Sequence, residues 1–142
     1  MIYLSKDLKR RIREKFQDCC AYCLSPQTLI PVTFEFDHII PTSAGGKTMF
    51  ENLCLACPSC NSYKHDAREV SDPETGKIIT LFHPQQDNWQ EHFAWNETYT
   101  LLLGKTPSAK VTLVKLHMNR PALVELRELW VAFGKFPPTF NL

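Results

Sequence analysis

The sequence has neither a long apolar run nor a marked excess of charge of one sign. No stretch of its 142 residues approaches the roughly 18 consecutive apolar residues that a membrane-spanning helix needs. The first fifteen residues, MIYLSKDLKRRIREK, lack the apolar segment of a secretory signal. The formal net charge is only +1, and this value alone indicates no nucleic-acid partner. These absences favour a globular protein of a reducing, cytoplasmic compartment and no contact with a membrane.

The first half of the chain carries signals for both helix and strand. Ser5 can cap a helix in which apolar residues recur every four positions, as far as about residue 17. Thr33–Phe36 alternates polar and apolar side chains, as a half-buried strand does. Pro58 suits the first turn of a further helix. The sequence therefore predicts an α+β fold.

The second half predicts short strands within 77–82 and 98–103, and then two helices that begin after Thr106 and at Pro121. The aromatic stripe Trp89, Phe93 and Trp95 is more typical of a core than of a base-stacking platform, because such rings bury large areas. We expect residues 1–70 to form a core with an N-terminal helix. Residues 71–142 are expected to form a mainly helical extension packed on it, so that the whole is one compact domain.

Six cysteines are present, and four of them form two Cys-x-x-Cys pairs, Cys20/Cys23 and Cys57/Cys60. Two such pairs supply the four thiolates of one closed tetrahedral zinc site. The alternatives are free thiols or three disulfides, but disulfides belong to secreted proteins and the chain shows no secretory signal. Cys19 could replace its neighbour Cys20, although only Cys20 reproduces the two-residue gap of the other pair.

Several short motifs lie between and after these pairs in a fixed order. They are Phe36-Asp37-His38-Ile39-Ile40-Pro41, Gly45-Gly46, Glu51-Asn52-Leu53, and then Asn61, Lys64 and His65 directly after the second pair. With these gaps, residues 18–67 resemble the HNH endonuclease family, in its version with two Cys-x-x-Cys pairs. The resemblance implies a ββα-metal core, in which a β-hairpin and a helix hold a metal ion, stapled here by a structural zinc on the four paired cysteines. It also implies that Cys54 is a buried thiol.

The resemblance implies a role for each matching residue. His38 corresponds to the general base, and Asn52 to the middle letter of the family name, so both are assigned to the catalytic centre. The Asn52 amide is expected to tie down the loop after His38 by hydrogen bonds to backbone. Asp37, Asn61 and His65 correspond to ligands of a catalytic divalent ion, Mg²⁺ or Mn²⁺, with Zn²⁺ or Ni²⁺ as alternatives. On their own, Asp37 could cap a turn, Asn61 could cap the helix, and His65 could stabilise the helix end.

These side chains suit the hydrolysis of a phosphodiester. A neutral His38 can take the proton of an attacking water at about pH 7. A divalent ion would stabilise the charge on the phosphate and on the departing 3′ oxygen. Because consecutive strand residues point to opposite sides of a sheet, Asp37 and His38 can face one phosphate only if the backbone bends there.

Basic residues near this centre are the candidates for contacts with DNA. Residues 1–15 contain six basic and two acidic side chains, and among them we single out Arg10 and Arg13. Lys47 and Lys64 are further candidates for phosphate contacts. A solvated helix face is the alternative reading of the charge run, and a surface lysine without a role is the alternative for Lys64.

We therefore expect a metal-dependent endonuclease that hydrolyses DNA phosphodiester bonds through one HNH centre and leaves 5′-phosphate ends. The resemblance favours an intracellular protein of bacterial or phage-like type. One centre makes one cut, so cleavage of both strands would need a homodimer or two events. The alternatives are a non-catalytic zinc-stabilised module that binds nucleic acid or protein, and a purely structural zinc protein.

Overall fold

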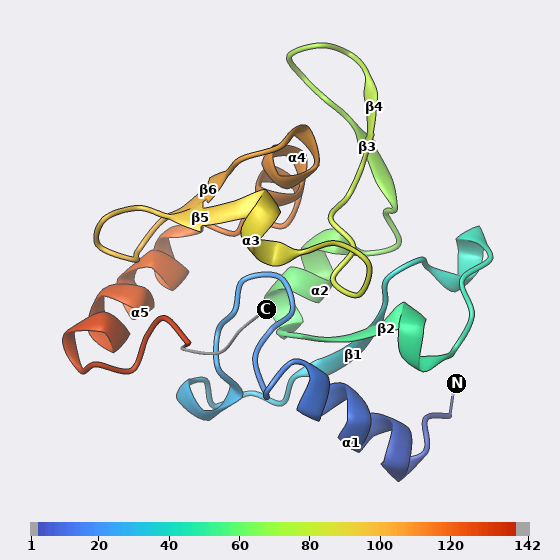
Figure 1. Ribbon diagram of the computed structural model, residues 1–142, viewed down its shortest axis with the longest axis horizontal. Coiled ribbons are helices and arrows are strands. Elements are labelled where there is room, and N and C mark those ends of the chain that lie inside the picture. Colours follow the sequence, from blue (N-terminus) through green and yellow to red (C-terminus); the bar gives the residue numbers. More distant parts are fainter. Residues whose placement is uncertain (1–2, 139–142) are drawn as a thin grey trace. The chain divides into compact units, whose positions relative to one another are not determined.

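Helices and short antiparallel strands make up the computed structural model, which describes residues 3–138 (Figure 1). The predicted α+β fold is confirmed. The chain divides into two compact units. The first contains the chain up to Arg68 together with His83–Gln86, and the second contains Glu69–Phe82 and the chain from Asp87 onwards. None of the helices within 3–138 is long and apolar enough to cross a membrane.

The first unit is built on a β-hairpin and a helix. Strands β1 (Glu35–His38) and β2 (Leu53–Ala56) pair antiparallel, and all four residues of β2 are buried. Helix α2 (Pro58–Lys64) follows β2 and contacts β1. It begins with a proline, which lacks a backbone N–H. This residue is tolerated there because an N–H in the first turn of a helix has no acceptor within the helix. The predicted ββα order is therefore present.

Strand β1 lies two residues further along the chain than the alternation at Thr33–Phe36 predicts. The side chain of Gln27, in the short helix η1 (Gln27–Leu29), accepts a hydrogen bond from the backbone N–H of Phe34 at 2.7 Å. This N–H is thus not available to a sheet. Pairing with β2 begins at Glu35 instead, which carries Asp37 and His38 into the strand itself.

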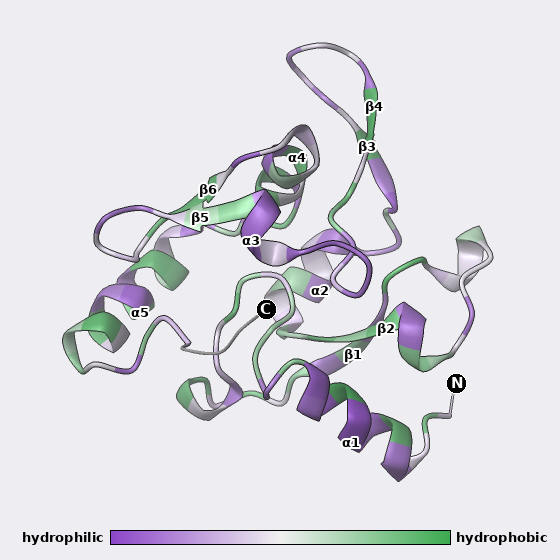
Figure 2. Cartoon of the chain, viewed as in Figure 1, coloured by the Kyte–Doolittle hydropathy of each residue, from purple (hydrophilic) through white to green (hydrophobic). Residues whose placement is uncertain are grey.

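Helix α1 (Lys6–Lys15) begins as predicted, with the Ser5 hydroxyl accepting a hydrogen bond from Leu8 N at 3.1 Å. Its apolar stripe is buried at Ile12 and, just beyond the helix, at Phe16. Figure 2 shows hydrophilic and hydrophobic residues alternating around this helix. The stripe faces β2 and the short helix η3 (Phe50–Asn52), both of which α1 contacts.

As far as residue 138, the second unit combines two antiparallel hairpins with three helices. Its hairpins are β3 (Glu69–Ser71) with β4 (Ile78–Thr80), and β5 (Phe93–Trp95) with β6 (Leu102–Gly104). Its helices within the described residues are α3 (Trp89–His92), α4 (Pro107–Lys115) and α5 (Pro121–Ala132). The two longer helices begin at the prolines from which they were predicted.

One strand of this unit differs from its prediction. The sequence favours a strand over 98–103, but β6 begins only at Leu102. The carbonyl oxygen of the Asn96 side chain accepts hydrogen bonds from the backbone N–H groups of Thr100 and Leu101, at 2.9 and 3.1 Å. These residues therefore form the turn of the hairpin rather than part of its ladder.

The aromatic stripe of the second unit lies in its core, as predicted. Trp89 and Phe93 are buried, with ring centroids 5.2 Å apart. Phe82 meets Phe93 edge to face at 5.2 Å. Trp95 is half-buried, and the Arg127 guanidinium lies 5.1 Å from the centre of its ring. These rings pack on one another, as core side chains do, instead of standing open to stack on bases.

Candidate functional site

The two Cys-x-x-Cys pairs meet in the first unit, as predicted. The Sγ atoms of Cys20, Cys23, Cys57 and Cys60 all lie within 4.8 Å of one another, and the four side chains are buried. The Sγ atoms of Cys23 and Cys57 are 3.8 Å apart. Four sulfurs at about 2.3 Å from a tetrahedral zinc are separated by about 3.8 Å. The cluster therefore has both the donor set and the spacing of a structural zinc site.

The two remaining cysteines lie outside this cluster. Cys20 belongs to it and Cys19 does not, which confirms the choice made from the two-residue gap. The Cys19 thiol is buried beside Gln17 O, and burial is the main cause that raises its pKa to about 12. Cys54 is fully buried on β2, and burial raises the pKa of this thiol as well. The prediction of a buried Cys54 thiol is confirmed.

Asp37 lies inside the first unit and carries a charged partner. Its carboxylate is only 6% exposed and forms an ion pair with the Lys64 ammonium, at 3.1 Å to Oδ2 and 3.3 Å to Oδ1. Burial raises the pKa of the Asp37 carboxyl above its ordinary value, whereas Lys64 and the Tyr22 hydroxyl lower it. The same ammonium donates a hydrogen bond to the backbone carbonyl of His38 at 3.0 Å. Lys64 thus joins the end of α2 to two successive residues of β1.

Tyr22 connects this ion pair to the cysteine cluster. It lies between Cys20 and Cys23 in the sequence, is 1% exposed, and donates a hydrogen bond to Asp37 Oδ2 at 2.9 Å. Sequence reasoning missed this residue. The only available signal was that an aromatic residue with a hydroxyl occupies a variable position of the first pair, and a buried tyrosine hydroxyl usually has a hydrogen-bond partner.

His38 points away from Asp37. Asp37 is buried, whereas His38 is half-buried and its Nε2 lies 2.9 Å from the Thr48 hydroxyl. Both belong to the regular pairing of β1 with β2, so the backbone does not bend between them. The hydrogen bond with Thr48 restrains the rotation of the imidazole. Sequence reasoning did not select Thr48, because nothing in its spacing links it to His38.

Asn52 ties down the loop between β1 and β2, as predicted. Its Oδ1 accepts a hydrogen bond from Ile40 N at 2.8 Å, and its Nδ2 donates to the carbonyls of Ile40 and Lys47, at 3.0 and 2.9 Å. Gly46 lies against the same place: a Cβ on it would come within 1.7 Å of Ile40 O. Asn52 is buried and acts on the loop, so it positions the residues after His38.

The three predicted ligands of a divalent ion have separate partners. Asp37 pairs with Lys64, and the Asn61 amide donates to Glu35 Oε1 at 2.9 Å. His65 is exposed, ends α2 with a positive φ of 53°, and places Nδ1 2.8 Å from Asp66 Oδ1. No hydrogen bond or ion pair joins any two of the three within residues 3–138. As they stand, all three side chains are engaged with other side chains.

The residues predicted to contact DNA differ in their surroundings. Arg10 is exposed and pairs with Asp7 and Glu14 on its own helix. The Arg13 guanidinium lies 4.9 Å from the centre of the Phe36 ring. Lys47 is exposed. Lys64 is 1% exposed, so a contact between its ammonium and a phosphate would require its release from Asp37.

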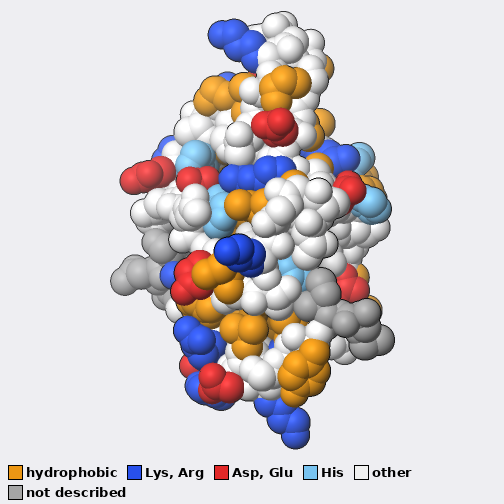
Figure 3. Space-filling view, turned by 90° about the vertical axis from the view of Figure 1, so that its right-hand side faces the viewer, with side chains coloured by type: hydrophobic (Ala, Val, Ile, Leu, Met, Phe, Trp, Pro, Cys, Tyr) orange, Lys and Arg blue, Asp and Glu red, His pale blue; other side chains and the backbone are white. Residues whose placement is uncertain are grey.

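One face of the molecule, drawn in Figure 3, shows Lys and Arg side chains interspersed with acidic and hydrophobic ones rather than gathered into one patch.

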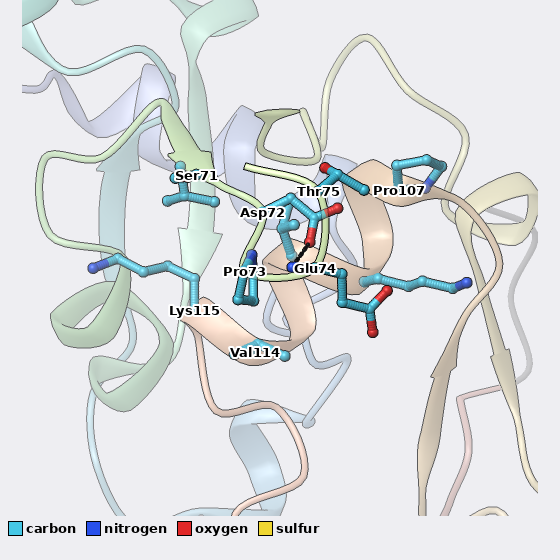
Figure 4. A pocket seen from close by; sticks show the side chains of 11 residues that line it. Ser71, Asp72, Pro73, Glu74, Thr75, Pro107, Val114 and Lys115 are labelled. Carbon is cyan, nitrogen blue, oxygen red and sulfur yellow. Dashed lines mark hydrogen bonds between the residues drawn. The ribbon is translucent and has the colours of Figure 1, made fainter. Parts of the chain in front are cut away.

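The second unit also has a pocket of about 540 Å³ between the β3–β4 turn and α4. In this turn Asp72 Oδ1 accepts a hydrogen bond from Glu74 N at 2.9 Å, the dashed line of Figure 4. The Asp72 carboxylate thus closes the turn, and the walls include apolar Val70, Val111 and Val114.

Comparison with known proteins bears on the first unit. Residues 20–67, about a third of the chain, match the family model described as HNH endonuclease. No curated protein and no solved structure matches the chain. The matched segment begins at the first cysteine of the cluster and extends past α2, so it contains the zinc-knuckle-like cluster, β1, β2 and His38. The resemblance seen in the sequence is thereby confirmed for this segment.

Proposed function

We propose that this protein is a metal-dependent endonuclease that hydrolyses DNA phosphodiester bonds, with His38 as its general base. One observation carries the proposal. Within the segment that matches the HNH family, His38 ends β1 with a half-buried imidazole whose rotation a hydrogen bond to Thr48 restrains. A base with a fixed orientation on a rigid strand is what proton removal from a positioned water requires.

The proton transfer can be assigned to atoms of this chain. In the tautomer that donates its Nε2–H to the Thr48 hydroxyl, Nδ1 of His38 has the lone pair that accepts a proton. Water that loses its proton to Nδ1 attacks the phosphorus, and the bond between phosphorus and the 3′ oxygen breaks. The 3′ oxygen takes a proton from solvent and becomes a hydroxyl, and the phosphate stays on the 5′ end. The pairing of His38 with Leu53 in the β1–β2 hairpin holds the backbone of the base in place.

The proposal includes a dependence of the nicking rate on a divalent cation, which the assay below measures. Such an ion, when bound, supplies positive charge beside the scissile phosphate. The predicted ligands Asp37, Asn61 and His65 are each engaged elsewhere, so no step is assigned to the ion. The structural zinc is a separate matter, because its four thiols fit it as they lie.

The experiment is a nicking assay on supercoiled plasmid with Mg²⁺, Mn²⁺, Zn²⁺ or Ni²⁺, and with a chelator. The unaltered protein is compared with His38→Ala and with His117→Ala, which removes an exposed imidazole of the second unit. His38→Ala should lower the nicking rate about a hundredfold or more, whereas His117→Ala should not change it. DNA ligase should reseal the nicks without prior phosphorylation, since the ends are 5′-phosphate and 3′-hydroxyl.

Equal nicking by His38→Ala and the unaltered protein would contradict the proposal, and so would the absence of nicking with all four metals. Linear product that rises with the square of protein concentration would support a homodimer that cuts both strands.

A second candidate function is a zinc-stabilised module that binds nucleic acid or protein without catalysis. The separate partners of Asp37, Asn61 and His65 favour it, because the cysteine cluster stabilises the fold without them. Salt-sensitive binding to DNA that is the same in His38→Ala, with no nicking by either protein, would support this function.

A further inference from the structure

The Lys64 ammonium lies in a cage of oxygen atoms. Its Nζ contacts both carboxylate oxygens of Asp37, at 3.1 and 3.3 Å, and the backbone carbonyl of His38 at 3.0 Å. The ammonium donates hydrogen bonds to Asp37 Oδ1 and to the His38 carbonyl, and its contact with Asp37 Oδ2 is an ion pair. The side chain of Lys64 is 2% exposed and that of Asp37 is 6% exposed. This is therefore a desolvated cation in a site built from oxygen.

The cage is held from two sides by buried groups. The Tyr22 hydroxyl donates to Asp37 Oδ2 at 2.9 Å, and the Cys54 thiol lies 3.8 Å from the same oxygen. Asp37 and His38 belong to β1, whose pairing with β2 fixes their backbone. These contacts restrain the oxygen atoms, whereas the Lys64 ammonium is carried by a long stem with several rotatable bonds.

Carboxylate and carbonyl oxygens are also the ligands that Mg²⁺ and Mn²⁺ prefer. The predicted divalent ion and the Lys64 ammonium would then compete for the same carboxylate oxygens of Asp37. A monovalent and a divalent cation cannot both occupy one buried cage, because like charges at such a distance repel strongly in a medium of low dielectric constant.

We propose that Lys64 is the resident cation of this cage and that a divalent ion binds Asp37 only by displacing it. Lys64 is thus a positioning residue that sets the metal affinity of the centre. The observed partner of Asp37 follows directly, because the structure has the ammonium-bound form. The inference rests on the proposed function only in that the ion belongs to the nuclease centre, and metal binding can be measured without DNA.

The test is a Mn²⁺ titration of the zinc-loaded protein, in which the electron paramagnetic resonance signal counts the free Mn²⁺. Lys64→Met keeps most of the stem and removes the charge. It should bind Mn²⁺ at least about tenfold more tightly than the unaltered protein, because the competing positive charge is gone. Lys15→Met, which removes an exposed charge of α1, should bind as the unaltered protein does. Adding Asp37→Asn to Lys64→Met should abolish the gain.

Equal or weaker Mn²⁺ binding by Lys64→Met that retains one zinc per chain would overturn the proposal, as would the absence of Mn²⁺ binding by both proteins. A measurement on the unaltered chain covers the case in which this variant does not fold. Acetylation by an N-hydroxysuccinimide ester, mapped by mass spectrometry, should find Lys64 protected without Mn²⁺ and reactive with it, with Lys15 reactive throughout. Protection of Lys64 at saturating Mn²⁺ would equally overturn the proposal.

The result of the Mn²⁺-binding test can be distinguished from the result of the nicking assay that tests the proposed function. If nicking is absent but Lys64→Met still gains affinity for Mn²⁺, the nuclease fails and the exchange of cations stands. If nicking depends on Mn²⁺ but Lys64→Met does not change its binding, the nuclease stands and the exchange fails.

Discussion

Replacing Asn52 by alanine is expected to release the loop between β1 and β2 and to destabilise the first unit without affecting the second. The side chain is buried and makes three hydrogen bonds to the backbone of Ile40 and Lys47. The net contribution of such a bond is about 1 kcal/mol, and a buried group left without its partner costs more. The loss in the free energy of unfolding should therefore be about 3 kcal/mol.

The three tryptophans allow this loss to be assigned to one unit. Trp89, Trp95 and Trp130 all belong to the second unit, whereas the cysteine cluster belongs to the first. Urea unfolding followed by tryptophan fluorescence thus reports the second unit, and zinc release to a coloured chelator reports the first. With a slope of about 1 kcal/mol per molar urea for a unit of this size, Asn52→Ala should lower the midpoint of zinc release by about 3 M.

The matched variant is Asn52→Asp, which keeps the acceptor for Ile40 N but loses both donors. It also places a carboxylate against the carbonyls of Ile40 and Lys47. It should therefore lower the zinc-release midpoint at least as much as alanine does. The reasoning is refuted if alanine shifts this midpoint by less than about 0.5 M, if the tryptophan transition moves equally, or if aspartate is the milder change.

Three further predictions concern single side chains. Tyr22→Phe removes the hydrogen bond to Asp37, a bond to a charged group worth about 1.5–3 kcal/mol; it should lower the zinc-release midpoint and the nicking rate while one zinc per chain is retained. Gly46→Ala should prevent folding of the first unit, since its Cβ would lie 1.7 Å from Ile40 O; a zinc-loaded, soluble product would contradict this. Burial raises the pKa of the Cys19 thiol to about 12, so below that pH it is almost entirely in the unreactive thiol form. Iodoacetamide should therefore label Cys19 only as the pH approaches that value. Labelling at about pH 8, near the ordinary thiol pKa, detected by mass spectrometry, would refute this.

The parts of the first unit that follow from local spacing were predictable. The paired cysteine gaps predict one tetrahedral cluster, and the structure has it. Ser5 and Pro58 mark the starts of α1 and α2, because capping and proline chemistry act within one turn. The Asn52 amide was expected to bond to the backbone of the loop after His38, and it does so at Ile40 and Lys47.

The parts that failed depend on contacts between residues distant in the sequence. The start of β1 was misplaced because the Gln27 side chain, seven residues earlier, takes the N–H of Phe34. The partner of Asp37 was not foreseen, because Lys64 lies 27 residues away and a lysine in the last turn of a helix is most often at the surface. Burial of a charge is decided by the partners that the fold brings to it, and sequence spacing carries no such information.

The structure also changes what the cysteine cluster does for the candidate centre. A closed zinc site is expected to do no more than link the turn after α1 to the start of α2. Tyr22, however, extends from between the two cysteines of the first pair to the carboxylate of Asp37, and Lys64 extends to the same carboxylate from the helix that begins at the second pair. Both halves of the cluster thus fix the orientation of one buried acid. Loss of the zinc should disturb Asp37 from two directions, and His38 through the carbonyl that Lys64 holds.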